Sequence, residues 1–178
     1  VAQLNGQDSM MVNTDSSLQL GSGYVQYDVL QKFSFVQKPG VRHHLNLQLS
    51  NSGNIDRYDR LTLMSGAKPK FAEWYYGPQK RLLAAYTLEL SKATKCYDNA
   101  RMILAYQGIE ESRMDRRFQN ESLNHRIEQL DIFTLNADFM KKMGAHEFRY
   151  GTEAYLNNVK STAFAENIYT GVQTVIDT

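Results

Sequence analysis

The sequence predicts an all-β protein whose strands follow one another as an up-and-down antiparallel meander. Apolar and polar residues alternate with a period of two in six separate segments, which is the pattern of strands with one apolar and one polar face. Short polar segments with Gly or Pro connect several of these strands as turns. The composition agrees, because 11 Tyr and 8 Phe against 3 Pro suit β-structure.

Residues 1–50 are predicted to hold a polar loop and the first strand pair. Residues 1–22 are rich in Asn, Asp, Ser, Gln and Gly, which favours a loop. The strand 23–36 alternates around an apolar set, and Pro39 and Gly40 mark the turn that follows. The strand 41–50 has the cleanest alternation, with Leu45, Leu47 and Leu49 on one face and Asn46 and Gln48 on the other.

Residues 51–111 are predicted as a long irregular loop followed by two strands. The loop 51–79 carries three Gly and two Pro, which interrupt any regular pattern. The strand 80–91 has Leu82, Ala84, Tyr86, Leu88 and Leu90 on one face. After a short turn at 92–98, the strand 99–111 repeats the alternation.

Residues 112–178 are predicted to contain a charged loop, the clearest hairpin and a terminal loop. The loop 112–124 is highly charged, and the strands 125–140 and 147–159 follow it. The turn 141–146 contains Gly144, which tolerates the positive φ of tight turns. A terminal loop is predicted over 160–178. One face of the hairpin carries Phe133, Leu135, Ala137, Phe139, Phe148, Tyr150, Thr152, Ala154 and Leu156.

The predicted connections alternate between short and long, so that all short turns fall at one end of the sheet. Outer-membrane β-barrels have this asymmetry, with short periplasmic turns and longer extracellular loops, whereas a soluble sandwich has no reason to sort its loops. Bacterial barrels begin at about 8 strands, and an open edge in lipid leaves backbone groups unpaired. We therefore expect residues 1–178 to be a partial barrel segment of a larger protein. Val1 and the polar residues after it show no signal peptide, which fits a mature form or an interior piece.

The alternation also predicts how the faces are used. Leu45, Leu47 and Leu49 are expected to face lipid, with Asn46 and Gln48 lining a wet lumen, because charged and polar groups on the lipid face are costly. Aromatic residues near strand ends would form girdles at the membrane interfaces, and the same residues would equally suit the core of a soluble sheet.

Several functional classes receive no support from the sequence. The net charge of +1 gives no reason to expect nucleic-acid binding, and there is no apolar run long enough for a transmembrane helix. His43 and His44 are neighbours on a strand, so they point to opposite faces and cannot share one metal ion. Cys96 is the single cysteine, and no catalytic constellation stands out. We expect neither an enzyme, nor a metal site, nor a cofactor.

Six segments together resemble TonB-dependent outer-membrane receptors of the Bacteroidetes type. They are RYDRLT at 57–62, FAEWYYGPQKR at 71–81, YDNAR at 97–101, DRRF at 115–118, RYGTE at 149–153 and STAFAEN at 161–167. The resemblance implies a barrel of about 22 strands with an N-terminal plug that is absent from this chain. It also implies energy coupling to the TonB–ExbB–ExbD system and location in the outer membrane of a Gram-negative bacterium.

Active uptake of a scarce large nutrient is the function that the resemblance implies. Ferric siderophore, haem and cobalamin are all open as substrates, and glycans and peptides also stay open. A passive outer-membrane porin and a soluble six-stranded binding module are the alternatives.

The predicted long loops contain the candidate ligand-binding residues. Arg binds carboxylate or phosphate through two parallel hydrogen bonds, and Tyr and Trp offer flat contact area. The same side chains could instead brace the loops through Arg–Asp pairs and aromatic packing. The candidates are Arg57, Tyr58, Arg60, Trp74, Tyr75, Tyr76, Arg116 and Arg117.

Overall fold

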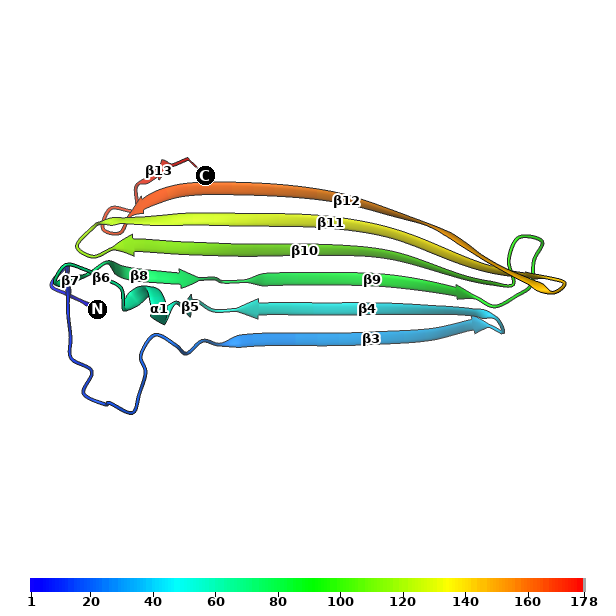
Figure 1. Ribbon diagram of the computed structural model, residues 1–178, viewed down its shortest axis with the longest axis horizontal. Coiled ribbons are helices and arrows are strands. Elements are labelled where there is room, and N and C mark those ends of the chain that lie inside the picture. The colour runs from blue at the N-terminus through cyan, green and yellow to red at the C-terminus, as the bar shows by residue number, and fades with distance from the viewer. Residues whose placement is uncertain (178) are drawn as a thin grey trace.

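The structure, a computed structural model that describes residues 1–177, is built around one large antiparallel sheet (Figure 1). The main path across this nine-stranded sheet is β13-β12-β11-β10-β9-β4-β3; β8 also pairs with β10, and β5 pairs with β8. The strands are β1 (Ala2–Leu4), β2 (Gln7–Ser9), β3 (Gln26–Lys38), β4 (Val41–Ser52), β5 (Ile55–Asp56), β6 (Met64–Ser65), β7 (Lys68–Pro69), β8 (Phe71–Tyr76), β9 (Lys80–Leu90), β10 (Asn99–Arg117), β11 (Ser122–Met143), β12 (His146–Asn167) and β13 (Gln173–Val175), and the one-turn helix α1 is Tyr58–Leu61.

The prediction of six antiparallel strands in an up-and-down meander is confirmed by β3, β4, β9, β10, β11 and β12. Each pairs with its neighbour in sequence, and β4 pairs with β9 across the long connection between them. The hairpin of β11 and β12 is longer than predicted, since its strands continue through 141–143 to a turn at Gly144, which has φ of 61°.

The predicted loop 112–124 is wrong, because β10 and β11 run through it and leave only the turn 118–121. Both faces of this stretch carry polar side chains, so it lacks the apolar alternation by which strands are recognised. Cross-strand polar contacts replace that pattern, as where Arg126 Nη1 lies 2.7 Å from Asp115 Oδ1. Likewise β12 extends to Asn167 and β13 follows, so the predicted loop 160–178 is partly strand, and Thr178 lies outside the described residues.

The long connection between β4 and β9 is confirmed, although it contains short elements of its own. It holds α1, the small β6–β7 hairpin and β8. β8 pairs with the last residues of β10, which lie beyond the part of β10 that pairs with β9. All of these elements lie at one end of the sheet, together with the β10–β11 turn (Figure 1). We call this the loop end, and the opposite end, with the β3–β4, β9–β10 and β11–β12 connections, the turn end.

The strand register assigns every side chain to one of two faces. Directly paired residues of an antiparallel sheet point to the same side, and the next residue along points to the other. One row across the middle of the sheet is almost wholly apolar, and the adjacent row is mixed. The first row is Phe33, Leu45, Tyr86, Leu104, Leu135 and Ala154, which defines the apolar face, and the second is Lys32, Asn46, Ala85, Ala105, Thr134 and Tyr155, which defines the polar face.

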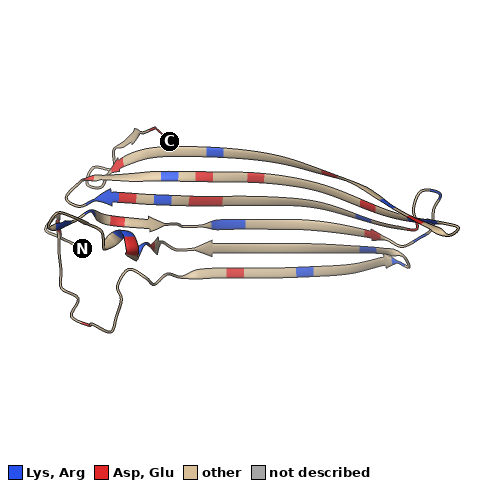
Figure 2. Ribbon diagram, viewed as in Figure 1, with Lys and Arg blue, Asp and Glu red and all other residues tan. Residues whose placement is uncertain are grey.

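A belt with very few charged residues crosses the middle of the sheet (Figure 2). On β9 it runs from residue 82 to residue 88, which spans about 20 Å at about 3.3 Å per residue. At its turn-end border, Arg42, Glu89, Arg101 and Asp138 form a single paired row on the polar face. Charges therefore gather toward the two ends of the strands, and Asp131, opposite Gly108, is the one charged residue of the described chain on the apolar face within the belt.

Within the belt, no second layer of described residues covers the apolar face. Leu104 and Phe133 are each 54% exposed and Leu156 is 73% exposed, while the buried hydrophobic residues are only Trp74, Ala100, Met114, Ala137 and Ala163. Leu47 and Gln48 are both half-buried, so exposure does not separate the two faces, although the register places them on opposite sides. The sheets formed by residues 1–177 are all open. No helix in this range is long and apolar enough to span a membrane.

Candidate functional site

All the side chains predicted to bind a ligand lie at the loop end, but on different faces of the sheet. Trp74 and Tyr76 pair with Asp115 and Arg113 of β10, which continue the polar face. Tyr75 and Arg116 alternate with these residues, so they lie on the side of the apolar face. The structure thus divides the predicted set into two groups with different surroundings.

Arg57 is the centre of the group on the polar face. Its Nε and Nη2 donate to Asp59 Oδ1 and Oδ2, each at 2.8 Å, and its Nη1 donates to the Tyr76 hydroxyl at 2.9 Å. The guanidinium also lies 5.3 Å from the ring centroids of both Trp74 and Tyr76. These hydrogen bonds raise the pKa of Arg57 and hold the pKa of the Asp59 carboxyl below its usual range. The Arg57 guanidinium is therefore held in place by hydrogen bonds beside the rings of Trp74 and Tyr76, and together they form one wall of the site.

Trp74 ties this wall to the sheet. It is buried and meets Tyr76 edge to face, with ring centroids 5.0 Å apart. Arg60 lies 5.7 Å from the Trp74 ring centroid and keeps about half of its side chain exposed. Aromatic pairs in this geometry add about 0.5–1.5 kcal/mol beyond their buried area. Trp74 thus braces the loop, and Arg60 remains open to solvent beside it.

Arg116 braces the loops, and its guanidinium is not open to a ligand. Its Nη1 and Nη2 donate to the two carboxylate oxygens of Asp8 at 2.8 Å, and its Nε donates to Glu73 at 2.6 Å. The side chains of Arg116 and Asp8 are 3% and 1% exposed. The bracing alternative thus describes Arg116, and a ligand-binding role for it is not supported.

Asp8 carries the other half of this buried pair. Burial opposes its ionisation, but the Arg116 hydrogen bonds, the backbone N–H of Gln119 and the charge of Arg116 prevail, so the pKa of Asp8 is lowered. The β1–β2 hairpin is thereby fixed to the β10–β11 turn. Tyr169 also contacts the same hairpin, because its hydroxyl donates to the Gly6 carbonyl.

The remaining predicted residues differ in access. Tyr58 is 45% exposed on α1, and Arg117 is exposed at the end of β10. Tyr75 is half-buried, and burial, followed by the nearby charge of Glu73, raises the pKa of its hydroxyl. His43 and His44 point to opposite faces, with His43 Nδ1 2.6 Å from the Tyr86 hydroxyl and His44 Nε2 3.4 Å from Glu89. Residues 1–177 contain no group of three or more His, Cys, Asp or Glu side chains placed to hold a metal ion.

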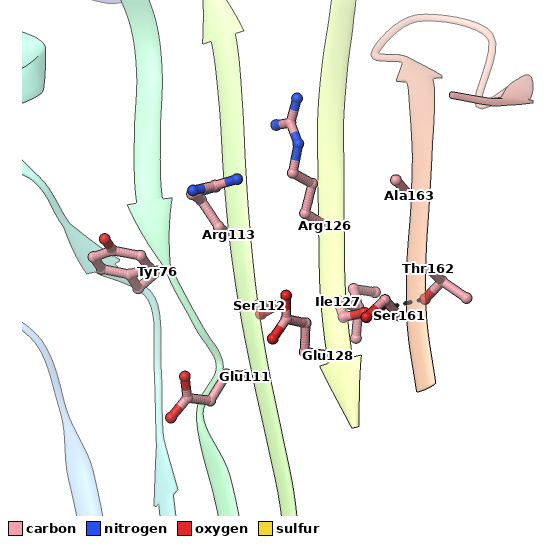
Figure 3. A pocket seen from close by; sticks show the side chains of 10 residues that line it. All are labelled: Tyr76, Glu111, Ser112, Arg113, Arg126, Ile127, Glu128, Ser161, Thr162 and Ala163. Carbon is pink, nitrogen blue, oxygen red and sulfur yellow. Dashed lines mark hydrogen bonds between the residues drawn. The ribbon is translucent and has the colours of Figure 1, made fainter. Parts of the chain in front are cut away.

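A cleft that the sequence did not reveal lies beside Tyr76 on the polar face (Figure 3). Its volume is about 340 Å³, it crosses β10, β11 and β12, and it shares Tyr76 with the Arg57 cluster. Its lining residues are Tyr76, Glu111, Ser112, Arg113, Arg126, Ile127, Glu128, Ser161, Thr162 and Ala163.

The charged residues of this cleft form two like-charged pairs. Glu111 of β10 is directly opposite Glu128 of β11, and Arg113 is directly opposite Arg126. Like charges in directly opposed positions destabilise a sheet. Arg126 is compensated by Asp115, whereas Arg113, Glu111 and Glu128 have no ion-pair partner within the described part of the chain. The site is thus a bipolar cleft that leaves charge of both signs available.

Comparisons with protein-family models, with curated proteins and with solved structures find no match to this chain.

Proposed function

We propose that this chain is part of the wall of a TonB-dependent outer-membrane receptor, and that this receptor takes up a scarce large nutrient with energy from the TonB system. The observation that carries the proposal is the bare apolar face of a single-layer meander, crossed by a charge-poor belt of about 20 Å. The apolar band of an outer-membrane barrel is about 25 Å tall, measured with strands that tilt. The belt is measured along the strands, and a tilt of about 35–45° reduces its height to about 14–16 Å, so it would occupy the middle of such a band.

The open edges of the sheet favour a larger barrel. β3 and β12 are long and well exposed, and β3 has no partner on its outer side among the described residues. Long exposed edges promote aggregation in water and leave unsatisfied backbone groups in lipid. Further strands on both sides would remove the problem, as in the barrel of about 22 strands that the resemblance implies.

The two ends of the sheet fit the two sides of the membrane. Short connections at the turn end suit the periplasmic side, and the braced connections at the loop end suit the extracellular side. In this orientation the polar face lines the lumen. The Arg57 cluster and the bipolar cleft would then meet a nutrient that enters from outside. The partners would be outer-membrane lipid, the TonB–ExbB–ExbD system and a small-molecule or metal-chelate substrate, with ferric siderophore, haem and cobalamin all open.

The test uses the full-length protein that contains this chain. We expect it in the outer-membrane fraction, and we expect a folded barrel that resists SDS at room temperature and changes its gel mobility on boiling. Growth on the limiting nutrient should require both this protein and an intact TonB system. Uptake that continues without TonB would identify a passive porin. A folded, detergent-free monomer in solution would instead identify a soluble binding module and refute the membrane assignment.

A further inference from the structure

The charges of the polar face are paired in opposite ways at the two ends of the sheet. Toward the turn end, the row Arg42, Glu89, Arg101 and Asp138 alternates in sign, and Arg101 Nε lies 4.0 Å from Glu89. At the loop end, the cleft instead pairs Glu111 with Glu128 and Arg113 with Arg126. The alternating row lets opposite charges stabilise the sheet, whereas the like-charged rows of the cleft oppose its formation.

We propose that the bipolar cleft binds a small linear zwitterion, of the size of a short peptide with free termini. The ligand's anionic end would lie at Arg113 and its cationic end at Glu111 and Glu128. This inference goes beyond the proposed transport function, because it assigns a small ligand to this cleft and does not name the large nutrient. It rests on that function only for the placement of the polar face in the lumen.

The spacing of the two charged rows sets the size of the ligand. They are two residues apart on each strand, which is about 7 Å at about 3.4 Å per residue. A free amino acid carries its two charges too close together to reach both rows. An extended chain spans at most about 3.3–3.6 Å per residue, so two or three residues suffice to place an ammonium and a carboxylate on the two rows.

The positions of the side chains make the basic row available to a carboxylate. Arg126 is turned toward Asp115, with Nη1 at 2.7 Å from Oδ1, so this pair is already satisfied. Arg113 lies on the Tyr76 side of the cleft, where its guanidinium has no ion-pair partner in the described range (Figure 3). Arg113 is therefore the cation that a ligand carboxylate would neutralise, and the Tyr76 ring forms the wall beside it.

The acidic row is available in the same way. Glu111 and Glu128 are both exposed, and neither makes an ion pair within the described residues. An ammonium group between them would relieve the repulsion of two carboxylates on directly opposed positions. Because one ligand would neutralise both rows, binding should depend on both of its charged ends.

Calorimetric titration of the full-length protein in detergent tests this inference, with triglycine as the probe. Two matched probes each lack one charge, namely triglycine amide, without the carboxylate, and N-acetyltriglycine, without the ammonium. Hydrogen bonds to charged groups set the expected effect, so removal of either charge should weaken binding about ten- to a hundredfold.

Four variants then connect each end of the ligand to one row. Arg113→Gln should bind triglycine and triglycine amide equally, and Glu111→Gln combined with Glu128→Gln should bind triglycine and N-acetyltriglycine equally. Arg149→Gln and Glu147→Gln remove the same charges at the turn end, and each should retain wild-type discrimination. Circular dichroism of each variant verifies that the barrel is folded.

Three outcomes would overturn the inference: no binding of triglycine, equal binding of all three probes to the wild-type protein, or equal effects of Arg113→Gln and Arg149→Gln. A barrel that is heat-modifiable and TonB-dependent but does not bind triglycine would leave the proposed function intact. A soluble protein that binds triglycine through Arg113 would refute the membrane assignment and retain the cleft.

Discussion

Arginine substitutions at graded depths on the apolar face provide a quantitative test of the membrane assignment. In β4, Leu45 lies midway between Val41 and Leu49, about 13 Å from each at about 3.3 Å per residue. An Arg on the lipid face of a barrel costs about 2–4 kcal/mol at the midplane and about 0–1 kcal/mol near the interfaces. Leu45→Arg should therefore lower the free energy of unfolding by about 2–4 kcal/mol, and Leu49→Arg by about 1 kcal/mol or less.

Three more substitutions complete this series. Leu47→Arg should fall between Leu45→Arg and Leu49→Arg, because its row lies between theirs. Asn46→Arg and Gln48→Arg place the same charge on the polar face and should change the free energy of unfolding by about 0.5 kcal/mol or less. The assay is a urea titration of the full-length protein folded into lipid vesicles, supported by the amount of each variant in outer-membrane fractions.

The series can also refute the lipid assignment. If the leucines packed against a second protein layer, the loss of unfolding free energy would follow the local packing of each leucine. It would not decrease from Leu45 to Leu49. Equal destabilisation by Leu45→Arg and Leu49→Arg would therefore contradict a bilayer around this face. Asn46→Arg that is as harmful as Leu45→Arg would contradict the assignment of the two faces.

Three further predictions concern the loop end and the strand pairing. Arg116→Ala leaves the Asp8 carboxylate buried without its partner, so it should destabilise the loop end by about 3–5 kcal/mol. The measurement is amide exchange, which should become faster in residues 2–9. Arg117→Ala, at an exposed position, should leave this exchange unchanged. Because the pKa of Asp8 is lowered in the folded protein, its ionisation fully stabilises the β1–β2 hairpin above the usual carboxyl pKa, and this stabilisation is lost as pH falls through the lower folded pKa. Amide exchange of the hairpin, corrected for its intrinsic pH dependence, should therefore rise in acid in the wild-type protein. The same exchange should stay flat in Asp8→Asn. Gly151→Ala would place its Cβ 2.5 Å from the Ala137 carbonyl oxygen, so it should weaken the β11–β12 pairing and reduce barrel assembly, whereas Ala154→Gly, which creates no such contact, should assemble normally.

The sequence was sufficient for the strands of the belt and insufficient for the loop end. In 41–50 and 80–91 one face is apolar, so the period of two is visible in hydrophobicity alone. At the loop end, past the Glu110–Gln129 pair, both faces of β10 and β11 are polar, so the period of two is no longer visible in hydrophobicity. The pairing of β8 with β10 joins segments far apart in sequence, which no local pattern can report.

The candidate site shows the same limit at the level of single residues. Arg57, Trp74 and Tyr76 were predicted from their chemistry, and the structure brings them together. Arg116 has the same chemistry but is neutralised inside the loop end by Asp8, which is more than a hundred residues away. Exposure decides whether an arginine binds or braces, and exposure depends on contacts that the sequence does not display.

The position of the β10–β11 turn is the one piece of information that the sequence lacks for predicting the cleft. Once the turn is fixed at 118–121, antiparallel pairing forces Glu111 opposite Glu128 and Arg113 opposite Arg126. A sheet selected for stability alone would tend to place opposite charges in directly paired positions, as in the alternating row at the turn end. Because the register is set strongly by the apolar face of the belt, a one-residue slip cannot relieve the repulsion without turning that face to the other side. The same alternation that forms the apolar face therefore retains the like-charged rows, and in the proposed binding mode a zwitterion would relieve their repulsion without a change in register.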